Sequence, residues 1–320
     1  MSVPRKQHRI CQIKWICTWR NKNREKKIRP GTGRGYRRNP AGRKKFLPWI
    51  LLAPSLLGVG IFTLIPFLDV FRRSFQKAVG TGFVGLENYR TVIDNQAFRL
   101  AAGNTGKFLL ICLPLLLGLS LFFALLLERL GRKGNLLKSG FLLPMAVPAA
   151  SVVLFWQLFF DRKGILNHIL ENFHIQGPDY MNSSAAFGVL VAVYIWKNLG
   201  YDMILWLSGL LGIPDSLYEA ARIDGAGEFQ CFWYITRPLL VQTAFLTGTL
   251  SLVNAFKVFR EAWMIAGNYP HDSIYMLQNL FNNWFLKLDM QKMTAGAVML
   301  AAVLGIFLIL CQKAEERWKQ

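Results

Sequence analysis

The sequence predicts an all-α membrane protein with six transmembrane helices, and its composition supports that prediction. Of the 320 residues 53% are hydrophobic, yet the formal net charge is +20. The Lys and Arg residues gather in blocks, and long runs without charge separate these blocks, a pattern typical of membrane proteins. Strand-like alternation is absent from the runs. Because backbone groups in lipid must find hydrogen-bond partners within the protein, the runs are expected to be helices.

Each of six apolar runs is near the ~20 residues that a helix needs to cross a ~30 Å hydrocarbon core. Five of them contain no charged residue, and the fourth in chain order carries only Lys197 and Asp202. The runs are Phe46–Leu68, Phe108–Leu127, Phe141–Phe160, Ala185–Leu211, Leu239–Phe256 and Met293–Cys311. They predict one transmembrane domain over residues 46–312, preceded by a tail of residues 1–45 and followed by a short C-terminal segment, 313–320.

Two local features are expected near the first span. Pro48, Pro54 and Pro66 should bend its helix, with neighbouring helices repairing the lost hydrogen bonds. The polar stretch Gly85–Asn95 in the external segment that follows predicts a short helix lying at the membrane surface.

The distribution of Lys and Arg predicts the orientation of the chain. The tail of residues 1–45 holds sixteen Lys and Arg against one acidic residue, Glu25. A cytoplasmic tail places the loop around Glu219 and the C-terminus in the cytoplasm too, in a multi-pass protein of the plasma membrane. The tail is expected to be disordered and to contact anionic lipid headgroups, at ~1 kcal/mol per basic residue. It shows no nucleic-acid-binding module, so no nucleic acid is expected as a partner.

No catalytic, metal or cofactor site is expected. Cys11 and Cys17 lack the closely spaced second ligand pair of a zinc site. His168, Glu171 and His174 are spaced by three, which spreads them around a helix instead of gathering them on one face. The sequence also lacks the G-x-x-x-x-G-K-[ST] phosphate-binding loop, so the chain is not expected to hydrolyse ATP itself.

The fourth run is unusual because Lys197 and Asp202 are each costly in lipid, by ~2.5–3.5 kcal/mol on insertion scales. Both should therefore face protein or water. In one interpretation Asp202 lines a translocation pathway with Trp196 and Asn198, and Asn254 of the fifth run contributes to it. In the other, these polar groups only join helices through ion pairs and hydrogen bonds. The sequence leaves both interpretations open.

A polar loop over about residues 212–238 separates the fourth and fifth runs. Pro214–Asp224 predicts a short helix within it. Ser216 is expected to cap this helix, and Glu219, three residues later, would complete a capping box. Gly225 is expected to end the helix in the left-handed conformation.

The order of residues in this loop resembles the cytoplasmic loop by which permease subunits of ABC importers dock on their ATPase. Within it, Ala220 and Ala221 offer a small surface that another subunit can approach closely. The positions that we assign to ATPase coupling are Glu219, Ala220, Ala221, Asp224, Gly225, Ile235 and Pro238. One departure is Arg237, where this family commonly has Leu before the proline.

From about Lys45 to its C-terminus the chain is similar to permeases of carbohydrate-type importers. The most specific stretch is Ile195–Ala226, and Leu51–Phe67, Gly85–Val92 and Leu142–Pro148 agree with it. The resemblance implies that this chain and a second permease form the pathway, driven by two ATPase subunits. It also implies an extracytoplasmic solute-binding protein that delivers a sugar or a related solute such as glycerol phosphate.

Two other classes of protein compete with this interpretation. An ion-coupled secondary transporter would usually show internal repeats, and it would leave the docking loop unexplained. A membrane enzyme would need a convergent catalytic set, which the scattered histidines do not offer. The importer permease is therefore the favoured hypothesis.

Overall fold

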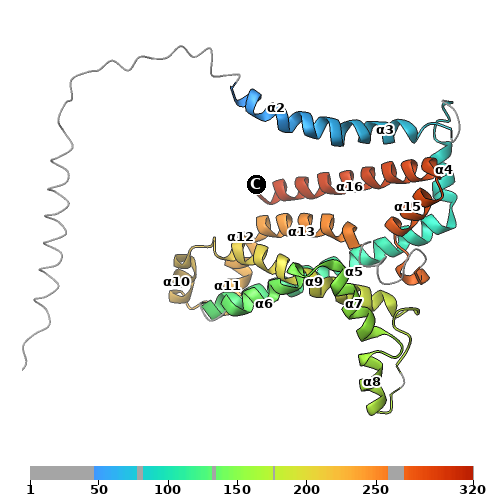
Figure 1. Cartoon of the computed structure of the whole chain (residues 1–320). Coiled ribbons are helices and arrows are strands. Elements are labelled where there is room, and N and C mark those ends of the chain that lie inside the picture. The colour runs from blue at the N-terminus through green and yellow to red at the C-terminus, as the bar shows by residue number, and fades with distance from the viewer. Residues whose placement is uncertain (1–46, 78–81, 132–134, 176, 259–269, 320) are drawn as a thin grey trace, which may run out of the picture. The chain divides into compact units, whose positions relative to one another are not determined.

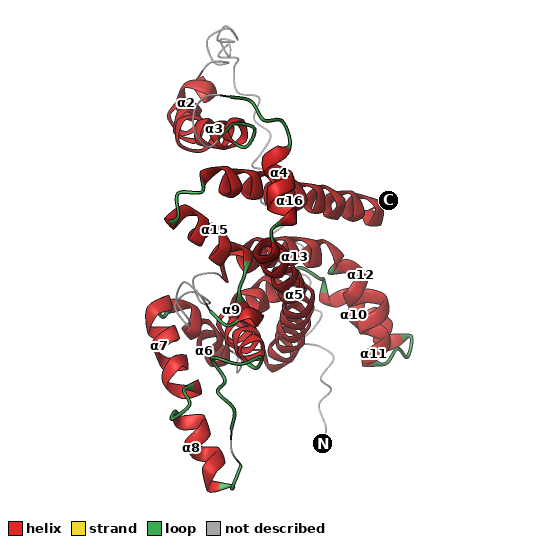
Figure 2. Cartoon of the chain, turned by 90° about the vertical axis from the view of Figure 1, so that its right-hand side faces the viewer, coloured by secondary structure: helices red, strands yellow, loops and turns green. Residues whose placement is uncertain are grey.

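The computed structural model describes residues 47–77, 82–131, 135–175, 177–258 and 270–319. Every regular element in these ranges is helical (Figure 2), and the only sheet-like contact within them is an isolated bridge between Gln76 and Phe83. The predicted all-α class is confirmed. The chain divides into two units, Met1–Thr63 and Leu64–Gln320. The basic tail of residues 1–45 lies outside the described residues.

Three described helical segments are long and apolar enough to cross a membrane, namely Leu52–Arg73, Gln96–Leu130 and Met290–Trp318. Two bent helix pairs would raise the number to five if each pair is one span. The structure thus supports a polytopic helical protein without establishing the predicted six spans. The helix of the fourth run, α9 (Ala186–Leu210), is a single helix of 25 residues, but Lys197 and its polar neighbours lower its apolar character.

A bend interrupts the third predicted span, and another lies at the start of the fifth. In the third, the stretch Leu137–Ala146 of α6 (Asn135–Ala146) and the stretch Ala150–Asn172, which begins in α7 (Ala149–Phe160), form an angle of 98°. Pro148 precedes α7 and has no backbone N–H, so the helix cannot continue through it. In the fifth, the helical stretch Glu228–Leu239 meets α13 (Val241–Ala255) at 65°. The first bend lies within the third run, whereas α13 covers nearly all of the fifth run, and the crossing of the membrane by both runs stays a prediction.

Prolines also shape two shorter stretches. A π-helical turn at Gly60–Leu64 lies between α2 (Leu47–Val59) and α3 (Ile65–Arg73), whose second residue is Pro66. A second π-helical turn, η4 (Phe232–Thr236), precedes Pro238 in the same way. The proline ring clashes with the carbonyl four residues earlier, and a widened turn accommodates that carbonyl.

The helix α9 lies among α5 (Gln96–Leu130), α6 and α13 (Figure 1), and its buried residues form most of the core. Two glycines allow the closest approaches. A Cβ at Gly200 would overlap the Phe141 carbonyl oxygen of α6, and one at Gly209 would overlap Thr243 of α13. The sequence therefore places small residues where the backbones of neighbouring helices meet, as membrane bundles require.

A helical cap closes the end of the bundle that the sequence places outside the membrane. The predicted surface helix is present as α4 (Glu87–Asp94), which packs on α16 (Met290–Lys319) beside α15 (Leu277–Leu286). The Asn104 amide of α5 donates hydrogen bonds to the Asp272 and Tyr275 carbonyls, at 2.5 and 3.0 Å. The remaining described elements are α8 (Ile165–Asn172), α10 (Asp215–Ile223), α11 (Glu228–Cys231), α12 (Arg237–Leu239), η5 (Phe256–Val258) and η6 (Asp272–Ile274).

Replacing Gly200 tests the close packing of α9. Gly200→Val is expected to destabilise the bundle by ~1–3 kcal/mol or more, because the added carbons meet backbone atoms that cannot turn away. The yield of monodisperse protein after heating in detergent, followed by size-exclusion chromatography, measures this loss. Gly188→Val on the same helix is the control, because a Cβ there would meet no atom within 4 Å. Equal behaviour of the two variants would contradict the close approach.

Candidate coupling loop

The predicted loop helix is present as α10, Asp215–Ile223. Its capping differs from the prediction. Pro214 occupies the N-cap position and makes no side-chain cap hydrogen bond, whereas Ser216 lies inside the helix. Ser216 was therefore the wrong capping residue, because Pro214, which is held in extended backbone, places the N-cap two residues earlier. Asp215 in the first turn and Arg222 in the last both complement the helix dipole.

Gly225 ends α10 in the left-handed conformation, with φ of +81°, as predicted. The Ala226 N–H donates to the Ala221 carbonyl at 2.9 Å, and the Gly225 N–H donates to the Arg222 carbonyl at 3.1 Å. These two bonds form a Schellman motif, which satisfies carbonyls that would otherwise lack partners at the end of the helix. Ala221 and Gly225 thus have a structural role that does not depend on any partner subunit.

The outer face of α10 is open to solvent. Ile223 is 86% exposed, Leu217 is exposed, and Glu219, Ala220 and Asp224 lie on the surface with them. Exposure of Ile and Leu side chains to water is unfavourable, and exposed apolar groups often mark a contact with another protein. The apolar, acidic and small residues of α10 together therefore offer a surface to such a partner. Four of the assigned coupling residues, Glu219, Ala220, Asp224 and Gly225, are therefore accessible, and Ala221 is half-buried.

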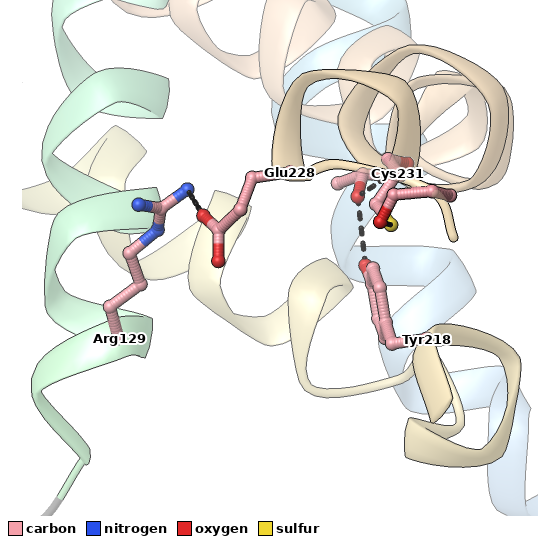
Figure 3. A network of polar contacts seen from close by, with 6 residues as sticks. Arg129, Tyr218, Glu228 and Cys231 are labelled. Atoms are coloured by element: carbon pink, nitrogen blue, oxygen red, sulfur yellow. Dashed lines mark hydrogen bonds and ion pairs between the residues drawn. The ribbon is translucent and has the colours of Figure 1, made fainter. Parts of the chain in front are cut away.

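The inner face of α10 is fastened to the start of the fifth predicted span. The hydroxyl groups of Tyr218 and Thr236 share a hydrogen bond of 2.8 Å, and Figure 3 shows Tyr218 pointing toward the helix that carries Cys231. Tyr218 and Ile235 both pack against the buried cluster that includes Trp206. Ile235 therefore acts through packing in the core. Pro238, one helix turn further, is exposed and widens the preceding turn.

A second connection joins the loop to α5. Arg129 and Glu228 form an ion pair of 2.5 Å between the end of α5 and the start of α11 (Figure 3). Both side chains are mostly exposed, so the pair contributes little stability in solution. Between α5, α10 and α11 lies a groove of about 680 Å³. Its charged lining consists of Glu128, Arg129, Asp215, Glu219, Arg222 and Glu228.

The four candidate pathway residues lie on α9 and α13, in surroundings that differ. Asp202 is 1% exposed and accepts a hydrogen bond of 2.6 Å from the Ser251 hydroxyl of α13. Trp196 is exposed and makes an edge contact with the Trp156 ring of α7, at a centroid distance of 5.4 Å. The Asn198 amide donates to the backbone of its own helix at 2.9 Å, and Asn254 is half-buried on α13. The role of these residues in a pathway stays a prediction.

Sequence reasoning missed the pairs that hold the loop in place. Tyr218, Thr236, Arg129 and Glu228 are ordinary polar residues, and nothing in their spacing shows that they meet. One signal could have indicated such a contact. Tyr218 lies three residues before Ala221 in the predicted helix, on the face opposite the exposed one, so its side chain could be expected to meet the core. No group of three or more His, Cys, Asp or Glu side chains with metal-binding geometry occurs in the described part of the chain.

Comparison with known proteins identifies the class to which this fold and loop belong. Residues 116–318 match the model of the family described as "Binding-protein-dependent transport system inner membrane component". The chain is 32% identical over 270 residues to the sn-glycerol-3-phosphate transport system permease protein UgpA of Escherichia coli O6:K15:H31. That match covers 82% of this chain and 91% of UgpA, and UgpA of Salmonella typhimurium LT2 gives the same figures. The chain therefore belongs to this family of transport-system inner membrane components.

Solved structures share the fold. A bacterial ABC transporter involved in the import of the acidic polysaccharide alginate has a TM-score of 0.76 at 19% identity. The match covers 85% of this chain and 96% of that one. A structure of the alginate ABC transporter in complex with an alginate pentasaccharide-bound periplasmic protein gives a TM-score of 0.74 at 19% identity, over 85% and 94% of the two chains.

The turn after α10 gives a testable prediction. Gly225→Val is expected to cost ~1–2 kcal/mol locally, because a side chain is strained at φ of +81°. Amide hydrogen exchange over residues 220–226 should accelerate about 5- to 30-fold. Gly227→Val is the matched control, because Gly227 has φ of −75° and ample space for a Cβ. Unchanged exchange in Gly225→Val would show that the Schellman turn does not hold the helix end.

The buried hydrogen bond between Asp202 and Ser251 gives a second testable prediction. Ser251→Ala removes the hydroxyl donor and leaves a buried carboxylate, so we expect it to cost more than Asp202→Asn, which leaves an amide oxygen for Ser251. Each kcal/mol lost should lower the melting temperature in detergent by ~2–4 °C. Ser208→Ala, at an exposed position of α9, serves as the control. Equal melting of Ser251→Ala and Ser208→Ala would contradict a stabilising role for the bond.

Proposed function

We propose that this chain is a permease subunit of an ABC importer and that α10 is its docking helix for an ATPase subunit. The observation that carries this proposal is the construction of the loop. Its outer face presents Glu219, Ala220 and Ile223, while its inner face is fastened to the core through Tyr218. Such a helix can receive a push from a partner and pass it inward. Membership of a family of binding-protein-dependent transport components supports the same assignment.

The path of the proposed movement runs through α9 and α13. α10 follows α9 in the chain, and α11 and η4 lead from it into α13. The two helices are joined at three levels: by Tyr218 and Thr236 in the loop, by the contact of Gly209 with Thr243, and by Asp202 with Ser251. A displacement of α10 would therefore move both helices as one body, because small shifts in packed interfaces are passed on and not absorbed.

The complete transporter would contain two permeases, two ATPase subunits and an extracytoplasmic solute-binding protein. In this proposal the chain spans the plasma membrane six times, with both termini in the cytoplasm. The fourth span is α9, whose Asp202 is buried among neighbouring helices while Lys197 and Asn198 are half-buried. ATP is hydrolysed by the partner subunits, and closure of those subunits on ATP drives α10 and switches the pathway between its outward- and inward-open states.

The proposed cargo is a carbohydrate or a related polar solute such as glycerol phosphate. The relatives described above, at 32% identity, are named as glycerol-3-phosphate permeases, and the structural neighbours are described as importing the acidic polysaccharide alginate. The candidate pathway positions remain Trp196, Asn198, Asp202 and Asn254. Among these, Asp202 is bound to Ser251 within the helix packing, which favours a role in joining helices. An ion-coupled secondary transporter is disfavoured, because it would not need a docking helix.

Purification from the native host tests the assembly. The tagged chain, extracted in a mild detergent, is expected to bring down an ATPase, a second permease and a solute-binding protein, which mass spectrometry would identify. The ligand retained by that binding protein would then name the cargo. A chain that is recovered alone and still transports solute after reconstitution would overturn the importer assignment.

Glu219 provides the sharpest single-residue test of docking. Glu219→Lys is expected to lower ATPase retention and solute uptake roughly tenfold or more, since reversing one charge at a protein interface costs several kcal/mol. Uptake by cells and ATPase recovery on the tagged chain are the two measurements. Glu316→Lys, an equally exposed charge reversal near the C-terminus, is the control. Normal uptake in Glu219→Lys cells would contradict the assignment of the loop.

A further inference from the structure

Three side chains form a stacked row along the segment that leads from the loop into the fifth predicted span. The rings of Phe229 and Trp233 are nearly parallel, at 14°, with centroids 6.2 Å apart. The Arg237 guanidinium carbon lies 4.3 Å from the centroid of the Trp233 ring. The three residues follow one another at intervals of four, so they occupy one face of the helical stretch from α11 to α12. We call this row the aromatic–arginine row.

The row faces outward and is not part of the core. Phe229 is 77% exposed and Trp233 is 46% exposed, although both are large apolar side chains. Arg237 is exposed too, and no carboxylate in the described part of the chain forms an ion pair with it. Stacking therefore fixes the row in one geometry while leaving its outer surface uncovered. Large rings in this position point to a partner outside the chain.

The chemistry of the row suits an anionic phospholipid. The Arg237 guanidinium lies over the Trp233 ring and the residue is exposed, so the N–H donors along the edge of the guanidinium are accessible from outside. Such a fixed donor edge binds phosphate oxygens in a bidentate manner. Trp and Tyr are enriched where membrane meets water, and Tyr234 is exposed beside the row. One side of this short helical stretch would thus contact both the lipid phosphate, through Arg237, and the membrane–water boundary, through its aromatic rings.

The surface next to the row is apolar, as a lipid-facing surface must be. Leu239 is exposed at the end of α12, and Leu246 and Val253, seven residues apart, are exposed on α13. Residues seven apart lie on one face of a helix. Exposed apolar side chains on the helix that follows the row are what contact with acyl chains requires. α10, in contrast, carries Asp215 and Glu219, which anionic headgroups would repel.

We propose that the aromatic–arginine row binds the phosphate of an anionic phospholipid in the cytoplasmic leaflet and anchors the inner end of the coupling loop to the membrane surface. The proposal rests on the proposed function only for placing the loop on the cytoplasmic side. Bound lipid would hold α11 and α12 in place while α10 stays free to meet a partner protein.

Lipid binding can be measured directly. The full chain, purified with whatever subunits accompany it, is titrated with phosphatidylglycerol, and native mass spectrometry counts the bound lipids. Arg237→Gln is expected to weaken phosphatidylglycerol binding about fivefold, the value for one basic residue near a membrane surface. Arg237→Lys keeps the charge but loses the planar stack, so its loss should be smaller. Trp233→Leu keeps an apolar side chain and should also weaken binding, because it frees the guanidinium.

Two controls make the result decisive. Arg162→Gln removes one exposed positive charge from the loop between α7 and α8, far along the chain from the row, and should leave phosphatidylglycerol binding unchanged. Phosphatidylcholine, which has no net charge, should not distinguish Arg237→Gln from the unaltered chain. If Arg237→Gln and Arg162→Gln bind phosphatidylglycerol equally, the proposed site is wrong. Size-exclusion chromatography of each variant before titration excludes misfolding as the cause.

Photocrosslinking separates lipid from protein as the partner. With Tyr234→p-benzoylphenylalanine, which places the crosslinker beside the row and leaves Trp233 intact, illumination of cells should give an adduct with the mass of a phospholipid. An adduct with an ATPase subunit would overturn the lipid assignment in favour of a protein contact. Lipid titration needs neither ATP nor solute. A chain that lacks ATPase partners but binds phosphatidylglycerol through Arg237 would therefore refute the proposed importer and not the lipid site.

Discussion

Enclosure of α9 is the constraint from which the rest of the bundle follows. A helix with Lys197 and Asp202 near its middle cannot face hydrocarbon, so its polar side must be covered by protein. α5, α6 and α13 pack around α9, so that Asp202 is buried and Lys197 is half-buried, and α6 and α13 can approach because Gly200 and Gly209 have no side chain. Asp202 then finds its donor in Ser251. The polar residues that would be a cost in lipid become the contacts that fix which helices lie side by side.

This packing also determines where the loop sits. α9 ends directly before α10, and η4 leads back toward α13, so the spacing of two packed helices sets the ends of the loop. The hydrogen bond between Tyr218 and Thr236 restricts the movement of α10 relative to the segment that leads into α13. A loop held at both ends and across its middle is stiff, although most of its outer surface is in solvent. Stiffness together with accessibility is what a mechanical connection between subunits requires, and it explains why this loop contains hydrogen-bonded turns at all.

Sequence reasoning succeeded where one residue or one run decides the outcome. Hydrophobic length located the helices, and Gly225 marked the end of α10 because few residues other than glycine adopt positive φ. It failed where the outcome depends on context. Ser216 is a good capping residue, but Pro214 already fixed extended backbone before it. An apolar run does not reveal that Pro148 divides it. Pairs such as Tyr218 with Thr236 depend on tertiary contacts that no local pattern records.

The two sides of the loop differ in chemistry, and this difference bears on how force could pass through it. α10 exposes acidic, small and aliphatic groups, which suit a protein surface, whereas the aromatic–arginine row exposes rings and a guanidinium. Movement of α10 changes the orientation of α9 and α13 only if another part of the loop stays fixed. If the row is held at the lipid surface, motion of α10 must appear as rotation of α9 and α13 about that point. Without such an anchor, the same push would shift the whole loop along the membrane and transmit less of it to the spans.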